Sequence, residues 1–173
     1  MPYQSIFFDL DGTLTDPKPG ITRSIQYALR ELGLDSPSED ELAIYIGPPL
    51  RQSFATLLDT DEPDRIEQAI TYFRNRFTRI GLYENTVYAG IEALLATTQT
   101  IAPLYLATAK PKPFATHILE HFNLKHFFTD IYGSELSGKF ENKVELLEHL
   151  LQTEKLQPEH CLMIGDRAMD ITA

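Results

Sequence analysis

The stretch Ile6-Phe7-Phe8-Asp9-Leu10-Asp11-Gly12-Thr13-Leu14 decides the fold. It opens with three apolar residues, too few for a helix, and this pattern indicates a strand buried on both faces. Two carboxylates and a glycine follow where the strand should end. In an open parallel sheet, ligands bind just beyond the carboxyl ends of the strands. We therefore expect Asp9 and Asp11 at the functional edge of such a sheet.

After residue 84, short apolar runs alternate with amphipathic helical patterns. The expected strands are Leu104–Ala107, Phe127–Tyr132 and Cys161–Ile164, and the expected helices are Ile91–Ala96, Phe114–Phe122 and a segment that opens at Lys143. Strands that alternate with helices form a parallel sheet with right-handed crossovers. The sequence therefore predicts an α/β fold with a Rossmann-like parallel sheet core, formed by residues 1–15 and 85–173.

Residues 16–84 interrupt this alternation with an all-helical pattern. Apolar residues spaced three and four apart mark helices over Ile21–Leu32 and Pro63–Ile80. Between them, the capping-box sequence Ser38–Glu41 begins another helix, and a short one is expected over Leu50–Leu58. We expect this segment to form a helical cap inserted after the first strand.

Composition narrows the classes of function. The chain has 173 residues, with 25 Asp and Glu against 15 Lys and Arg, so its formal net charge is −10 at pH 7. An acidic chain argues against binding of nucleic acid polymers, which usually requires a basic patch. The same charge means that a site for an anionic substrate must provide its own local positive charge.

Neither a membrane span nor secretion is expected. The longest weakly charged stretch, Ile91–Ala109, is divided by Thr97-Thr98-Gln99-Thr100 into a helical and a strand-like part, so we interpret it as core. The first residues, Met1–Asp11, contain no basic residue and run directly into acidic groups, which is not the pattern of a secretory signal. The single cysteine, Cys161, excludes an intrachain disulfide and agrees with a reducing compartment. We expect a cytoplasmic protein and leave its oligomeric state open.

Side chains suited to phosphate chemistry follow several of the expected strands. The carboxylate of Asp9 can attack phosphorus and form an aspartyl-phosphate. Asp11, two residues on, would protonate the leaving alcohol and later deprotonate the attacking water. Two carboxylates this close repel each other unless a cation lies between them, and Mg²⁺ prefers such oxygens. The expected metal ligands are Asp9, Asp11, Asp166 and Asp170.

The other candidates would hold the phosphate. Thr108 would donate its hydroxyl to a phosphate oxygen, and Lys143 would neutralise charge on the nucleophile and on the transferring group. Gly12 lets the backbone turn its N–H groups toward the phosphate. The residues expected to bind substrate are Gly12, Thr13, Arg51, Ala109 and Lys110.

Together these residues resemble the haloacid dehalogenase-like phosphatases. The four family motifs fall at Phe8–Leu14, at Thr108, at Lys143 and at Gly165-Asp166 with Asp170. The helical insert is similar to the cap that the family places after its first motif. Ile46–Arg51 and Ala107–Pro111 are similar to the phosphoglycolate phosphatase and 5′-nucleotidase-like branch.

The resemblance implies a Mg²⁺-dependent phosphatase for a small phosphorylated metabolite, either phosphoglycolate or a nucleoside 5′-monophosphate. One alternative is a sugar phosphomutase of the same superfamily. Another is a catalytically impaired, truncated fragment that only binds phosphate or metal. Family members continue past the fourth motif with a helix and at least one more strand, whereas this sequence ends at Ala173. We therefore expect the C-terminal part of the core to be missing.

Three patterns have competing interpretations. A calcium loop that begins at Asp9 would need Glu at its twelfth position, where Gly20 stands. The stretch His117–His121 spells H-x-x-E-H, a zinc-protease signature, but we interpret it as the solvated face of an amphipathic helix. Lys139 competes with Lys143 for the same role, and Lys143 is preferred because it opens the amphipathic helix.

Overall fold

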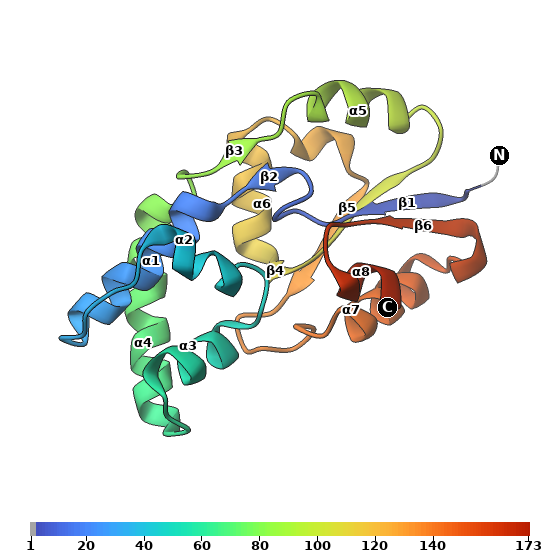
Figure 1. Ribbon diagram of the computed structural model, residues 1–173. Helices are drawn as coiled ribbons and strands as arrows, with labels where there is room; N and C mark the ends of the chain where they lie inside the picture. The colour runs from blue at the N-terminus through green and yellow to red at the C-terminus, as the bar shows by residue number, and fades with distance from the viewer. Residues whose placement is uncertain (1–2) are drawn as a thin grey trace. The chain divides into compact units, whose positions relative to one another are not determined.

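The computed structural model describes residues 3–173, which divide into two compact units (Figure 1). One unit holds the residues up to Asp16 together with Thr86–Ala173, and the other is Pro17–Asn85. The first contains a parallel sheet flanked by helices, and the second is helical. The α/β fold that the sequence predicts is confirmed.

The four-stranded sheet has the order β5-β4-β1-β6 with all neighbours parallel. The strands are β1 at Ser5–Phe8, β4 at Leu104–Pro111, β5 at Asp130–Ser134 and β6 at Cys161–Ile164. Phe8, the last residue of β1, pairs with Leu106 on one side and Ile164 on the other. Because β1 is an inner strand, the residue after it emerges in the middle of the carboxyl edge.

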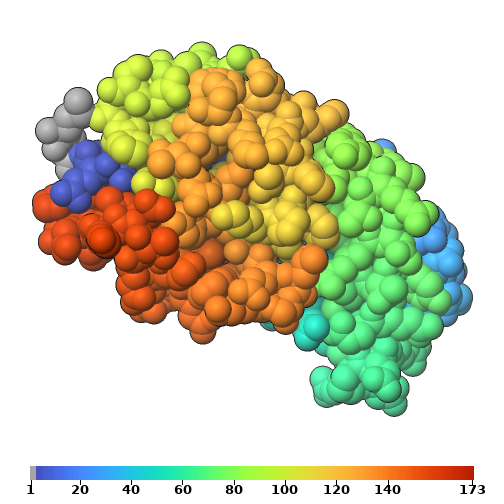
Figure 2. Space-filling model, turned by 180° about the vertical axis from the view of Figure 1, so that it is seen from behind, coloured from blue at the N-terminus to red at the C-terminus, as the bar shows by residue number. Residues whose placement is uncertain are grey.

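Helices cover both faces of this sheet. On one face, alternate strand residues pack against α7 (Lys143–Glu154) in a buried cluster of Phe7, Tyr105, Ala107, Tyr132, Leu146, Leu147 and Leu150. The helices α5 (Ile91–Thr98) and α6 (Lys112–His121) lie on the other face. Figure 2 shows the molecule from behind, with α5 at the surface in yellow-green. The short helix α8 (Ala168–Thr172) follows β6 on the side of α7.

A short two-stranded ribbon joins the two points at which the chain leaves and re-enters the sheet unit, the unit formed by the residues up to Asp16 and by Thr86–Ala173. The strands β2 (Thr15–Asp16) and β3 (Thr86–Val87) pair in antiparallel fashion, with Thr15 opposite Val87. The N–H of Tyr88 donates to the carbonyl of Leu14 at 3.1 Å and extends the ribbon by one bond. The sequence does not predict this ribbon, because two-residue strands are too short to show an alternating pattern.

Four α-helices make up the second unit. They are α1 at Lys18–Glu31, α2 at Glu39–Leu42, α3 at Leu50–Leu58 and α4 at Pro63–Arg76, with a 3₁₀ turn at Ala43–Tyr45. The capping box of α2 is formed as predicted, with Ser38 and Glu41 exchanging bonds. The predicted start of the first helix at Ile21 is wrong. The helix begins at Lys18, since Pro19 fits its first turn, where no backbone donor is needed.

The predicted helix over Pro63–Ile80 is present, but it is α-helical only to Arg76, and its last turn, Phe77–Gly81, is π-helical. This turn packs closely against α1. A Cβ on Gly20 would collide with the carbonyl oxygen of Gly81. The glycine at position 20 thus permits a backbone approach that any side chain would prevent.

Two strand boundaries in the sheet unit differ from expectation. Residues Lys125–Phe127 form a 3₁₀ turn, and β5 begins only at Asp130. The buried ring of Phe127 explains the error, since an apolar residue that packs from a turn gives the same local pattern as one in a strand. The second boundary that differs is the end of β4, which extends to Pro111, whereas the predicted strand ends at Ala107. A further 3₁₀ turn lies at Pro158–His160.

The weakly charged stretch Ile91–Ala109 consists of α5, a turn and most of β4. Throughout residues 3–173, no helix combines the length and the apolar character needed to cross a bilayer.

Candidate active site

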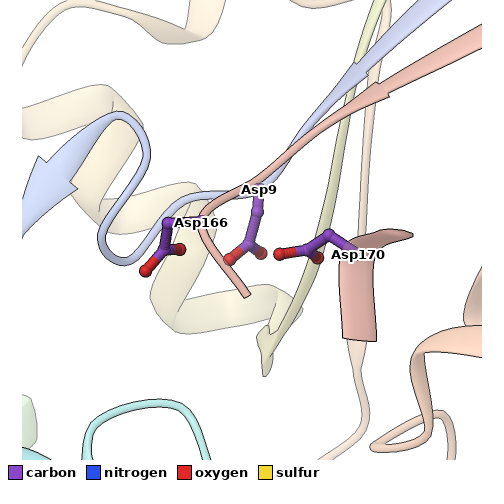
Figure 3. A group of neighbouring side chains, drawn as sticks. All are labelled: Asp9, Asp166 and Asp170. Atoms are coloured by element: carbon purple, nitrogen blue, oxygen red, sulfur yellow. The ribbon is translucent and has the colours of Figure 1, made fainter. Parts of the chain in front are cut away.

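Three carboxylates converge at the carboxyl edge of the sheet (Figure 3). Asp9 follows β1, Asp166 follows the neighbouring strand β6, and Asp170 stands in the first turn of α8. One oxygen from each lies within 4.8 Å of the others. The N–H of Asp9 donates to the carbonyl of Ile164 at 2.9 Å, which ties the two strand ends together. Asp9 is only 8% exposed, so its charge is largely removed from water.

A buried lysine lies against this cluster. The Nζ of Lys143 donates to Asp9 Oδ1 at 3.0 Å and to the carbonyl of Ala107 at 2.8 Å. It also lies 2.8 Å from Asp170 Oδ1, an ion pair that lacks the angles of a hydrogen bond. Lys143 is the first residue of α7, whose start is fixed by Asn142, the side chain of which accepts from the N–H of Val144. The helix start therefore sets where this ammonium group lies.

The sequence offered two candidates, Lys139 and Lys143, for the lysine beside the carboxylates, and in the structure it is Lys143 that lies there. Its side chain is 2% exposed. The side chain of Lys139 is exposed and lies 3.7 Å from Glu135 in the loop before α7. The local positive charge that an acidic protein needs at an anion site is thus present beside Asp9.

Burial raises the pKa of the Asp9 carboxyl above its ordinary value. The ammonium of Lys143 opposes this shift, and the nearby charge of Asp11 adds to it. A cation beside the carboxylates would favour their charged form. The donors present fit Mg²⁺, which prefers carboxylate oxygens, because oxygens of three carboxylates lie within 4.8 Å of one another and one lysine is shared by two of them. The residues that could hold the ion are Asp9, Asp166 and Asp170.

Two glycines make room for these carboxylates. Gly12 has a φ of +86°, and a Cβ there would collide with the carboxylate of Asp166. A Cβ on Gly165 would collide with the carboxylate of Asp170. Thr13, expected to bind substrate, is 3.3 Å from Asp166 Oδ1 and donates its hydroxyl to it. The loops after β1 and β6 are thus closely fitted to each other through small residues.

Asp11 lies beside this group but outside it, although the sequence suggested it as a fourth metal ligand. Its Oδ2 forms an ion pair with Lys110 Nζ at 2.8 Å. Its Oδ1 is buried and accepts no hydrogen bond. The sequence suggested that Lys110 binds substrate, whereas in the structure its ammonium group forms an ion pair with the carboxylate of Asp11.

The remaining residues that the sequence suggested for the site lie either in β4 of the sheet unit or in the helical unit. Thr108 is buried in β4 and its Oγ1 accepts from the N–H of Lys110 at 3.3 Å. The carbonyl of Ala109 accepts from Ser134 Oγ at 2.8 Å. Sequence reasoning missed Ser134, since a lone serine in β5 carries no signal of its own. Arg51 belongs to α3 of the helical unit, where its guanidinium lies 2.8 Å from Glu67, and its role in substrate binding stays a prediction.

The H-x-x-E-H stretch is an exposed face of α6. His117, Glu120 and His121 are all exposed, and Glu120 forms an ion pair with Lys125 at 2.6 Å. Among the residues that the structure describes, the side chains grouped closely enough to hold a metal ion are the three aspartates, not these. The interpretation as a solvated helix face fits this placement.

Similarity to known proteins extends along the whole chain. The model of the haloacid dehalogenase-like hydrolase family matches residues 6–173. A curated 5′-nucleotidase from Pseudomonas aeruginosa is 51% identical, over 98% of this chain and 76% of its own length. A phosphoglycolate phosphatase from Photobacterium profundum is 31% identical, over 97% of this chain and 77% of its own. Tyrosine-protein kinase PtkA from Mycobacterium tuberculosis is 36% identical, but this chain spans only 57% of it.

A solved structure gives the same result for the fold. The crystal structure of a predicted phosphatase from Clostridium acetobutylicum superposes with a TM-score of 0.91 at 39% identity. The match covers 98% of this chain and 78% of that one. The match of the family model to nearly every residue, and the 51% identity with one relative, establish that this chain belongs to the haloacid dehalogenase-like hydrolase family.

Proposed function

We propose that this chain is a Mg²⁺-dependent phosphatase that hydrolyses a small phosphomonoester through an aspartyl-phosphate on Asp9. The observation that carries the proposal is the buried carboxylate of Asp9, 3.0 Å from Lys143 Nζ and grouped with Asp166 and Asp170. The reaction class, a phosphoric monoester hydrolase, is supported by membership of a hydrolase family and by the names of the phosphatase relatives.

In the first step, a carboxylate oxygen of Asp9 attacks phosphorus, and the bond from phosphorus to the ester oxygen breaks. Asp11 gives its proton to the leaving oxygen, which departs as an alcohol. The ammonium of Lys143 offsets negative charge on Asp9 and on the transferring phosphoryl group. The hydroxyl of Thr108, buried in the neighbouring strand β4, would donate to a phosphate oxygen.

In the second step, a water molecule attacks the phosphorus of the aspartyl-phosphate, and Asp11 accepts the proton that the water loses. The bond between phosphorus and the Asp9 oxygen breaks, which releases inorganic phosphate and restores the carboxylate. Mg²⁺, held by Asp9, Asp166 and Asp170, would offset the charge between the carboxylates and the substrate phosphate when bound. The proton that Asp11 gives up in the first step is thus regained in the second.

Two substrate classes are proposed. The relative at 51% identity is named a 5′-nucleotidase, which favours nucleoside 5′-monophosphates, and phosphoglycolate follows from the relative at 31%. The helical unit would act as the cap that selects between them, with Arg51 as the residue for the far end of the substrate. A cytoplasmic location belongs to this proposal and agrees with the free thiol of Cys161.

The test is phosphate release from a panel of nucleoside 5′-monophosphates, 2-phosphoglycolate and hexose phosphates, with Mg²⁺ and with EDTA. We expect hydrolysis only with the metal, and none by Asp9→Asn. Mass spectrometry after acid quenching should find a phosphoryl group on the Asp9 peptide of the wild type. Full activity of Asp9→Asn would refute the mechanism. Isomerisation of a hexose phosphate without phosphate release would indicate a phosphomutase, and inactivity on the whole panel an impaired fragment.

A further inference from the structure

The strand β4 contains a bulge where it reaches the site. Thr108 pairs with Gly133 of β5, but the next pair is Pro111 with Ser134. Ala109 and Lys110 are therefore extra residues on β4 with no counterparts on β5. Such bulges interrupt the regular alternation of side chains and often redirect one beside an active site.

Contacts with β5 hold this bulge in one shape. The hydroxyl of Ser134 donates to the carbonyl of Ala109 at 2.8 Å. A Cβ on Gly133 would lie 2.6 Å from the carbonyl oxygen of Lys110, so only glycine permits this approach. Within the bulge, the N–H of Lys110 donates to Thr108 Oγ1 at 3.3 Å. The backbone direction at Lys110 is thus fixed from both strands.

The bulge brings the Lys110 side chain to Asp11. Nζ and Oδ2 are 2.8 Å apart, and the side chains are 6% and 13% exposed. A pair with this little water is weakly screened, so the ammonium strongly orients the carboxylate. The other oxygen of Asp11, Oδ1, accepts no hydrogen bond although it is buried. One oxygen of Asp11 is therefore held and the other is left for a further partner.

We propose that Lys110 is a positioning residue for Asp11, which it fixes through Oδ2 so that Oδ1 exchanges the proton with the leaving alcohol and the attacking water. This inference rests on the proposed function, in which Asp11 is the acid and the base. It replaces the expectation that Lys110 binds substrate. The two roles differ kinetically, because a lysine that acts through Asp11 affects the rate of the chemical steps, whereas one that binds substrate affects KM.

The experiment compares Lys110→Met with the wild type on the best substrate of the panel. We expect kcat to fall about 10- to 100-fold, the loss that misplacement of a reacting group produces, with KM changed by less than about twofold. Lys112→Met is the matched control. Lys112 lies two residues on, is exposed and forms an ion pair with Asp130, so this variant should keep wild-type kinetics.

A double-mutant cycle separates action through Asp11 from an independent effect. If Lys110 works through Asp11, adding Lys110→Met to Asp11→Asn should lower kcat by less than about threefold beyond Asp11→Asn alone. Losses that multiply in the double variant would overturn the inference, as would a rise in KM with unchanged kcat. Should Lys110→Met fail to fold by circular dichroism, Lys110→Gln serves in its place.

A structural readout keeps the inference separate from the proposed function. Absence of turnover in the wild type counts against the proposed function. Crystal structures of the wild type and of Lys110→Met then test the positioning by itself. We expect the Asp11 carboxylate to change its rotamer when the lysine is lost. An Asp11 side chain that keeps its place would overturn the inference, whatever the activity.

Discussion

Replacement of Lys143 by methionine tests the electrostatic basis of the site. The ammonium contacts Asp9, Asp170 and the carbonyl of Ala107, all within 3.0 Å, and the side chain is 2% exposed. Lys143→Met leaves two buried carboxylates without their cation. Removal of one partner from a buried pair costs about 3–5 kcal/mol. Because the three contacts share one ammonium, their contributions do not add, and we expect a total loss in that range.

The assay is urea unfolding followed by circular dichroism, at pH 8 with EDTA, with the free energy obtained by linear extrapolation. Lys139→Met is the matched control, since this nearby lysine is exposed and lies 3.7 Å from its partner Glu135. It should change the free energy of unfolding by less than about 0.5 kcal/mol. Turnover should fall sharply in Lys143→Met and stay unchanged in Lys139→Met.

The loss in Lys143→Met should also depend on pH. The ammonium of Lys143 opposes the rise in the pKa of Asp9 that burial causes, so its removal raises this pKa further. In Lys143→Met, Asp9 therefore takes up a proton more readily as the pH falls, and a neutral carboxyl group does not need a cation beside it. The deficit relative to the wild type should therefore shrink as the pH falls from 8 toward 5. A deficit below about 1 kcal/mol at pH 8, or one that grows on acidification, would refute this account of the site.

Three further predictions concern the same site. Gly12→Ala puts a Cβ into the carboxylate of Asp166 at a φ of +86°, so it should lower stability by at least about 1 kcal/mol and abolish phosphate release. Gly33→Ala, at φ +74° in open space, should keep full turnover. Asp9 has a raised pKa, so its folded form binds a proton more tightly than the unfolded form, and stability falls as the pH rises from 3.8 through the raised value. The stability of Asp9→Asn relative to the wild type should thus rise as the pH increases from 3.8 through the raised pKa of Asp9, measured in thermal melts with EDTA, and the opposite trend would contradict this sign. Mg²⁺ at about 100 times its Kd should stabilise the wild type against unfolding by about 2.7 kcal/mol. It should stabilise Asp166→Asn much less, because this variant lacks one of the three carboxylates. Equal stabilisation of both proteins would exclude a metal site formed by the three carboxylates.

Local patterns in the sequence were enough to place the main parts of the site. Three apolar residues before Asp9 mark the inner strand, and the last apolar run marks β6 before Asp166. The choice of Lys143 over Lys139 depended only on where an amphipathic helix begins, and the structure has α7 begin there. Each of these features is set by residues that are neighbours in the chain, so a short window contains the information.

The features that the sequence did not predict depend on pairing between distant segments. The bulge at Lys110 exists only relative to β5, where Gly133 and Ser134 set the register. Register is a property of two strands together, and no window of one strand contains it. The same reason hid the ion pair between Lys110 and Asp11, which lie far apart in the sequence. The late start of β5 at Asp130 is a different error, in which packing of Phe127 imitated a strand.

The β2–β3 ribbon makes the helical segment an exchangeable module. The chain leaves the sheet unit at Asp16 and returns at Thr86, and these two residues are paired partners. The ends of residues 17–85 are therefore held together by the ribbon itself, and closure of even a long loop costs little more than closure of a short one. Any folded module with adjacent termini could be grafted at this base while β1 and β4 keep their register. Under the proposed function, in which the helical segment selects the substrate, exchange at the β2–β3 ribbon would change substrate choice and leave the strand ends that carry Asp9 and Asp166 unaltered.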